Sequence, residues 1–222
     1  GLKHCTIQEL NQFLEVILLI EQLTLIVLLV MVSILCTSRS GSTNLSLYLK
    51  EVLNLGLITS PFINNEGEIG SLKKNNLYKL MIHRLPNGYN DLYEFGKDVI
   101  NLSDTVILYD RKDKLQQSES LAFKKLKYGN DFSKYHIREP YDNVDEKFVN
   151  ECLFEYNKHS KVIARLSNDF NIPIFWYEEI YYENGLKKLS DYLRIKINKK
   201  TKERFLSNNK RERIFNIKGK MI

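Results

Sequence analysis

The stretch Ile34-Leu-Cys-Thr-Ser-Arg-Ser-Gly-Ser-Thr-Asn44 decides the fold that this sequence predicts. Residues 28–35, which lead into it, are almost wholly aliphatic, as in a strand buried on both faces of a parallel sheet. From Thr43 onward, apolar residues recur at the spacing that lines one side of a helix. A tight turn of small residues between a strand and a helix presents unpaired backbone N–H groups at the positive end of the helix dipole. The sequence therefore predicts a cradle for an anion such as phosphate or sulfate.

The loop differs from the phosphate loop of nucleotide-hydrolysing proteins. That loop reads Gly-x-x-x-x-Gly-Lys-Ser/Thr, in which the lysine reaches the terminal phosphates and the hydroxyl holds magnesium. Here Ser42 follows Gly41 directly, and the fixed cation is Arg39, two residues before the glycine. A purely structural interpretation is also open, in which Ser42 or Thr43 only caps the following helix.

The segment Ser38-Arg39-Ser40-Gly41-Ser42-Thr43 resembles the Pro-Arg-Ser-Gly-Ser-Thr signature of sulfotransferases, with Ser38 in place of the proline. The resemblance implies that these six residues hold the 5′-phosphosulfate of the donor PAPS (3′-phosphoadenosine 5′-phosphosulfate). It also implies that Arg39 takes part in catalysis, because a cation there would balance the charge that develops on the leaving phosphate.

A second segment, from Arg111 to Ser120, is similar to the part of that family that binds the 3′-phosphate of the donor. The wording Arg-x-Asp-Lys-x-x-Gln-Ala-x-Ser is that of the bacterial carbohydrate branch, the trehalose sulfotransferase type. The residues that fall on this pattern are Arg111, Asp113, Lys114, Gln117 and Ser120, with Ser118 in place of the alanine. The resemblance implies that Arg111 and Ser120 bind the 3′-phosphate, for which the donor fork of an arginine is suited. The bland interpretation is a solvated helix start.

The general base is left open between a histidine and a glutamate. Residues 79–86 loosely resemble the Lys-Thr-His-Leu-Pro segment of cytosolic sulfotransferases, whose histidine is the base, but Lys79 stands four residues before His83 rather than two. An imidazole suits proton abstraction near neutral pH. The bacterial branch instead uses a glutamate in the loop after the first helix, where this chain offers Glu66 or Glu68. A merely structural role for all three is the remaining interpretation.

Other conspicuous side chains are expected to be structural. We expect Tyr177 and Glu178, which follow a short late strand, to act as anchors. The remaining histidines are expected at the surface: His4, His136 and His159.

The order of elements predicts one α/β domain over residues 28–222, with a P-loop-like parallel sheet and helices on both faces, the sulfotransferase fold. Beyond the strand at 28–35, strands are expected at 77–83, 104–109 and 174–176, and helices at 148–170 and 186–193 and after Arg111. Residues 54–70 are expected to form a loop. Residues 1–27 are an apolar extension, expected to be helical over 7–21. The run 16–35 is long enough to span a membrane, which is the alternative.

The amino-acid composition limits the class of protein and the binding partners that can be expected. The 222 residues, 43% hydrophobic and 27% charged, are typical of an ordinary folded protein. Three scattered cysteines predict neither a disulfide framework nor a zinc site, and no metal is expected. From Arg194 onward, eleven basic residues face only Glu203 and Glu212. Such a basic tail can bind nucleic acid or an anionic membrane. We expect no nucleic acid, because PAPS itself is a suitable anionic partner.

The leading hypothesis is a sulfotransferase that moves a sulfuryl group from PAPS to a hydroxyl of a carbohydrate, glycolipid or similar small acceptor. The first alternative is a P-loop nucleotide or small-molecule kinase, which magnesium dependence would distinguish. The second is a non-enzymatic basic module that binds anions or nucleic acid. The expected location is the cytoplasm, or a membrane surface reached through residues 1–27, and the oligomeric state is left open.

Overall fold

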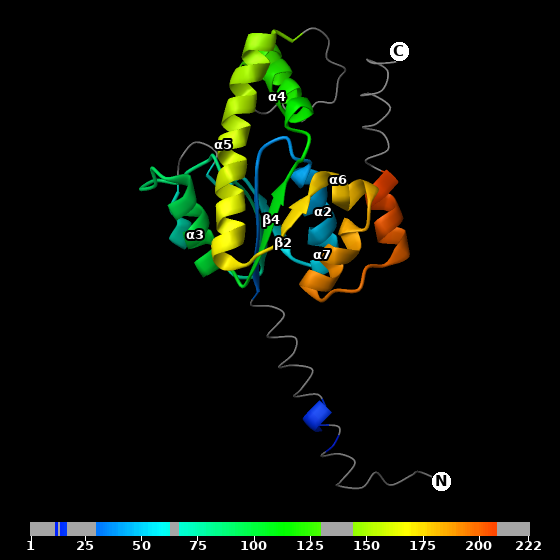
Figure 1. Ribbon diagram of the computed structural model, residues 1–222. Helices are drawn as coiled ribbons and strands as arrows, with labels where there is room; N and C mark the ends of the chain where they lie inside the picture. Colours follow the sequence, from blue (N-terminus) through cyan, green and yellow to red (C-terminus); the bar gives the residue numbers. More distant parts are fainter. Residues whose placement is uncertain (1–11, 13, 17–29, 63–66, 130–143, 208–222) are drawn as a thin grey trace, which may run out of the picture.

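A five-stranded parallel sheet forms the centre of the computed structural model, which describes residues 12, 14–16, 30–62, 67–129 and 144–207 (Figure 1). The strand order is β2-β3-β1-β4-β5. The strands are β1 (Met31–Cys36), β2 (Gly56–Thr59), β3 (Asn76–Met81), β4 (Thr105–Asp110) and β5 (Ile174–Trp176). Since every pairing is parallel, all strands end at one edge of the sheet, where β1 runs into the predicted anion loop.

Helices cover both faces of this sheet. They are α2 (Ser42–Leu53), α3 (Leu92–Leu102), α4 (Lys114–Tyr128), α5 (Glu146–Phe170), α6 (Tyr177–Tyr182) and α7 (Gly185–Leu193), with a short 3-10 helix η1 (Ile69–Ser71) and a further helical stretch at 199–207. The central strand shows how the layers are built. Ile34 packs into a core shared with α2, α6 and α7, whereas Leu35, which points to the opposite face, packs with α3 and α5. The predicted α/β fold with a parallel sheet and helices on both faces is confirmed.

Several elements were not predicted, among them β2 and α3. The segment expected to be a loop after α2 contains β2, a four-residue edge strand that is mostly exposed and therefore carries no apolar signal. The helix α3 is obscured by Gly96, which a helix interior ordinarily disfavours. Its position explains the glycine, because a Cβ atom there would lie 2.4 Å from Cδ1 of Leu166 on α5. The glycine lets α3 and α5 approach closely.

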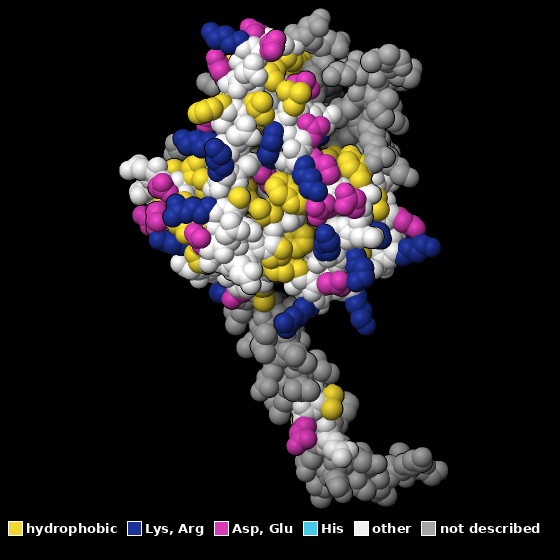
Figure 2. Space-filling model, viewed as in Figure 1, with side chains coloured by type: hydrophobic (Ala, Val, Ile, Leu, Met, Phe, Trp, Pro, Cys, Tyr) yellow, Lys and Arg dark blue, Asp and Glu magenta, His cyan; other side chains and the backbone are white. Residues whose placement is uncertain are grey.

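One face of the described residues is mixed in charge. On the face shown in Figure 2, Lys and Arg side chains are interspersed with Asp and Glu, as on an ordinary globular protein. No helix within the described ranges is long and apolar enough to cross a membrane. Residues 17–29 of the apolar run and the part of the basic tail from 208 onward lie outside those ranges, and the membrane and basic-tail expectations stay predictions.

Candidate functional site

The loop between β1 and α2 has a backbone shape that only a few residue types adopt readily. Arg39 and Gly41 both lie in the left-handed region, with φ of 57° and 79°. The buried hydroxyl of Ser40 donates to the carbonyl oxygen of Thr37 at 2.7 Å and closes the turn. A Cβ atom on Gly41 would lie 2.7 Å from two ring carbons of Tyr177 on α6. Both the backbone angle and the close ring therefore require glycine at position 41.

The start of α2 is suited to an anion. The residue that precedes the helix is Gly41, and no described side chain caps the first turn. This contradicts the bland interpretation, in which Ser42 or Thr43 serves only as a cap. The first turn carries no acidic residue either. Its N–H groups are thus presented to a ligand at the positive end of the helix dipole.

The two predicted phosphate motifs meet through Arg39 and Ser120. The guanidinium of Arg39 donates from Nε at 3.1 Å and from Nη2 at 2.9 Å to the hydroxyl oxygen of Ser120, which lies on α4. Ser38, the residue before Arg39, is bonded in turn to the hydroxyl of Tyr156 on α5, at 2.8 Å. The fold therefore places the loop after β1 against the helix that follows β4, as the two motifs require.

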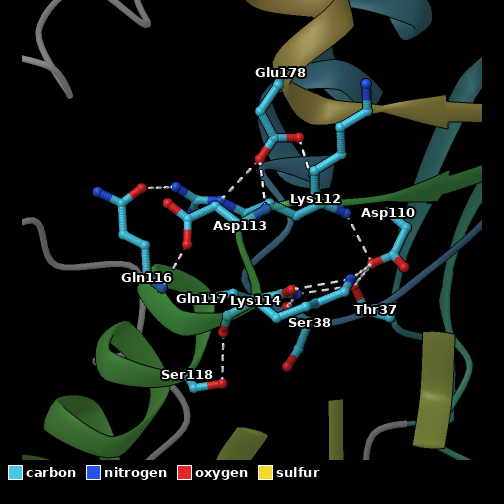
Figure 3. A network of polar contacts seen from close by, with 11 residues as sticks. Thr37, Ser38, Asp110, Lys112, Asp113, Lys114, Gln116, Gln117, Ser118 and Glu178 are labelled. Carbon is cyan, nitrogen blue, oxygen red and sulfur yellow. Dashed lines mark hydrogen bonds and ion pairs between the residues drawn. The ribbon is translucent and has the colours of Figure 1, made fainter. Parts of the chain in front are cut away.

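Arg111 is held in place by its neighbours at the end of β4. Its Nη2 donates to the side-chain oxygen of Gln116, and its guanidinium carbon lies 4.8 Å from the ring centroid of Tyr177. Its Nε atom is buried and lies 3.7 Å from a carboxylate oxygen of Glu178. The same carboxylate accepts the backbone N–H groups of Lys112 at 2.9 Å and Asp113 at 3.0 Å (Figure 3). Glu178 thus acts as an anchor for the turn that carries Arg111.

A buried polar network supports the loop from below. Asp110 is completely buried, and its Oδ1 accepts the hydroxyl of Thr37 at 2.7 Å and the ammonium of Lys114 at 2.5 Å. Gln117 donates to the Thr37 hydroxyl at 2.8 Å and also to the carbonyl oxygen of Ser38 (Figure 3). Burial lowers the pKa of Lys114, and Asp110 opposes this effect. The shape of the site thus depends on contacts between β1, β4 and α4 rather than on the loop alone.

One cation of the site was not among the predicted site residues. Lys79 lies on β3 with its side chain 5% exposed, and its ammonium donates to the hydroxyl of Thr43 at 2.9 Å. No carboxylate within the described ranges is bonded to it. Burial lowers the pKa of Lys79, the nearby Cys36 raises it, and Arg84 lowers it further. A buried cation without a counter-ion, aimed at an anion loop, is energetically unfavourable until an anion arrives.

The residues predicted as candidate general bases lie in different environments. His83 follows β3, its Nδ1 is buried, and its ring stacks on that of His159. Glu68 is exposed at the start of η1, and Glu66 lies outside the described residues. The expectation that His159 is at the surface is wrong, because only 9% of it is exposed. Its position on the buried stripe of α5 is the signal that was missed, since Cys152, Tyr156, His159, Ile163 and Leu166 recur at helical spacing.

The described residues contain no group of three or more His, Cys, Asp or Glu side chains that could hold a metal ion. The expectation that no metal is needed stays a prediction, as does the assignment of the base.

Comparison with known proteins identifies the fold. No protein-family model matches the chain, and no curated protein matches its sequence. Among solved structures, the crystal structure of mouse sulfotransferase SULT7A1 complexed with PAP is similar, with a TM-score of 0.50 and 15% sequence identity over 80% of this chain and 63% of that one. The chain therefore spans less than two thirds of the length of that structural neighbour. The likeness shows that this chain has the α/β fold of the sulfotransferases.

Proposed function

We propose that this protein is a sulfotransferase that moves the sulfuryl group of PAPS to a hydroxyl group of a carbohydrate, glycolipid or similar small acceptor. The observation that carries the proposal is the contact between Arg39 and Ser120, at 2.9 Å and 3.1 Å. It brings two motifs that are far apart in the sequence to one place at the edge of the sheet. The structural neighbour, which was crystallised with PAP, supports the same donor.

The side chains around the loop fit a donor with several negative charges. The loop residues Ser38 to Thr43 and the first turn of α2 offer N–H groups and hydroxyls to a 5′-phosphosulfate. Arg111 and Ser120 are the residues that would hold a 3′-phosphate. Lys79, whose ammonium points to Thr43, supplies a cation close to the same loop. PAPS would supply an activated sulfuryl group there.

Sulfuryl transfer requires a base that takes the proton of the acceptor and cations that stabilise the leaving group. In the proposed step, the acceptor oxygen forms a bond to sulfur while the bond from sulfur to the phosphate oxygen breaks, and its electron pair stays on that oxygen. His83 takes the hydroxyl proton. Arg39 and Lys79 balance the charge that gathers on the leaving phosphate, as cations do in phosphoryl transfer.

The acceptor and the place of action are the less constrained parts of the proposal. A carbohydrate acceptor rests on the similarity of residues 111–120 to the bacterial carbohydrate branch, and membrane association through residues 1–27 stays an alternative. A cytoplasmic location is supported by Cys36 and Cys152, which are buried free thiols and suit a reducing compartment.

The test is a calorimetric titration of PAP without magnesium, with ATP and magnesium as the comparison. We expect PAP to bind, and each of the variants Arg39→Ala and Arg111→Ala to weaken it about tenfold or more, since each removes charge-assisted hydrogen bonds. Lys187→Ala, which removes an exposed cation on α7, is the matched control and should bind as the wild type does. Binding of ATP with magnesium in place of PAP would support the kinase alternative. Absence of binding by both PAP and ATP would count against both the sulfotransferase and the kinase.

A further inference from the structure

Two histidines from distant parts of the chain stack on each other beside the loop. His83 follows β3 and His159 lies on α5, and their ring centroids are 5.2 Å apart with an angle of 20° between the planes. His159 was expected at the surface, and nothing in the proposed donor site uses it. The pair therefore calls for a role of its own.

The surroundings of the pair keep both rings neutral near pH 7. The Nδ1 atoms of both histidines are buried, and neither has a hydrogen-bond partner among the described residues. The pKa of His83 is lowered to about 3, first by burial and then by His159, by Arg84 on the same loop and by Lys125 on α4. The pKa of His159 is also lowered, first by burial and then by Lys158 and Lys114, whereas Glu155 and Asp110 oppose the shift.

Unpartnered ring nitrogens in a buried place are uncommon in purely structural histidines. A histidine kept for packing alone usually has its ring N–H bonded to a backbone or carboxylate oxygen. Because Nδ1 of His83 is buried, Nε2 is the ring nitrogen that can accept the proton of an acceptor hydroxyl. The stack fixes the plane in which that nitrogen lies.

The helix α5 connects this pair to the anion loop. Tyr156 precedes His159 by three residues, so both side chains lie on one face of the helix. The two rings meet edge to face with centroids 6.4 Å apart, and the Tyr156 hydroxyl is bonded to Ser38 at 2.8 Å. A continuous chain of contacts thus runs from the loop to His83.

We infer that His159 is a positioning residue, whose ring, stacked on His83 and supported through Tyr156 by the loop, sets the direction from which His83 takes the proton of the acceptor hydroxyl. The inference rests on the proposed function, with His83 as its base. His159 itself forms no bond and transfers no proton. The proton passes from the acceptor oxygen to Nε2 of His83 as the new bond to sulfur forms.

The experiment compares His159→Ala, which removes the ring, with His159→Phe, which keeps a flat ring without nitrogens. Turnover is followed as PAP formed from PAPS, with water or an added alcohol as acceptor, and PAP affinity is measured by calorimetry. We expect His159→Ala to lower turnover about tenfold or more with PAP affinity within about twofold of the wild type, because a small displacement of a base is costly. His159→Phe should keep most of the turnover. Lys161→Ala, which removes an exposed cation two residues further along the same helix, is the control.

The pH profile separates positioning from general damage. Loss of the stacked ring admits water to His83, so the acid limb of turnover should move toward the ordinary histidine pKa in His159→Ala and stay in place in Lys161→Ala. The pKa of His83, measured by NMR titration of its imidazole, should move in the same direction, and this measurement does not depend on turnover. If His159→Ala does not fold, His159→Asn gives the same comparison.

Wild-type turnover and an unmoved acid limb in His159→Ala would overturn the inference, and so would a loss of PAP affinity equal to the loss of turnover. Failure of the wild type to bind PAP would instead overturn the proposed function, while the NMR titration would still report whether His159 controls His83.

Discussion

The ammonium of Lys79 lies 2.9 Å from the hydroxyl of Thr43, so a buried cation on β3 touches the first turn of α2 without a counter-ion in the described part of the chain. This relationship brings a charge to the anion loop from a strand rather than from the loop sequence. A nucleotide-hydrolysing loop instead carries its lysine within the loop, directly after its last glycine.

We expect Lys79→Met to weaken PAP binding and to raise the stability of the ligand-free protein. The first effect follows from loss of a cation at the loop, and the second from removal of a buried charge, by about 1 kcal/mol or more. The pKa of Lys79 is lowered by burial, so wild-type stability should fall as the pH falls below about 10.5, and the variant should lack this slope. Urea unfolding at a series of pH values measures the stability and its dependence on pH, with the exposed Lys73→Met as control. Unchanged PAP affinity would exclude a ligand role for Lys79.

Gly41→Ala should abolish detectable PAP binding and lower the free energy of unfolding by about 1–3 kcal/mol, because a Cβ atom meets both a positive φ and the ring of Tyr177. Gly88→Ala is a matched control, since Gly88 has φ of 88° but no heavy atom within 4 Å of an added Cβ. It should show the backbone penalty alone, about 1 kcal/mol. Equal losses in the two variants would mean that Tyr177 does not crowd the loop.

Glu178→Gln should weaken PAP binding about three- to tenfold, because the turn of Arg111 loses a carboxylate that accepts two backbone N–H groups. Glu179→Gln is the adjacent control, since Glu179 pairs with the exposed ammonium groups of Lys112 and Lys188 instead. Calorimetry on both variants decides the point, and equal affinities would show that the turn holds without Glu178.

The stacked histidines should make the protein sensitive to acid. A histidine with a lowered pKa in the folded state is protonated more readily in the unfolded chain, so stability falls as the pH drops below about 6.5. With the pKa of His83 at about 3, the loss between pH 6.5 and pH 5 should be about 2 kcal/mol. Urea unfolding at both pH values measures it. His83→Phe should flatten the dependence, and a wild-type profile in that variant would rule out His83 as the cause.

The parts of the fold that local sequence encodes were predictable. The aliphatic run before Cys36, the small residues around Gly41 and the pattern from Arg111 to Ser120 each carry their own signal, and the fold that they indicated is confirmed. Their contact through Arg39 follows from the parallel sheet, because β1 and β4 are neighbours that end at the same edge.

The parts that depend on contacts between distant residues were not predictable in the same way. Lys79 shares a face of β3 with Leu77, and only the packing of α2 over that face shows that its ammonium reaches Thr43. The acceptability of Gly96 in α3 depends on Leu166, which is 70 residues further along the chain. The burial of His159 could have been predicted from the sequence, since the helical spacing of its apolar neighbours places it on the buried face of α5.

The position of Glu178 in the chain has a consequence for the order in which the protein matures. The anion loop and the turn of Arg111 are both synthesised before residue 115, but the carboxylate that fixes this turn arrives only with α6, after β5 has joined the sheet. A nascent chain that stops short of α6 lacks both that carboxylate and the Tyr177 ring that lies against Gly41. Donor binding is therefore expected to appear late in synthesis, as a property of the completed sheet.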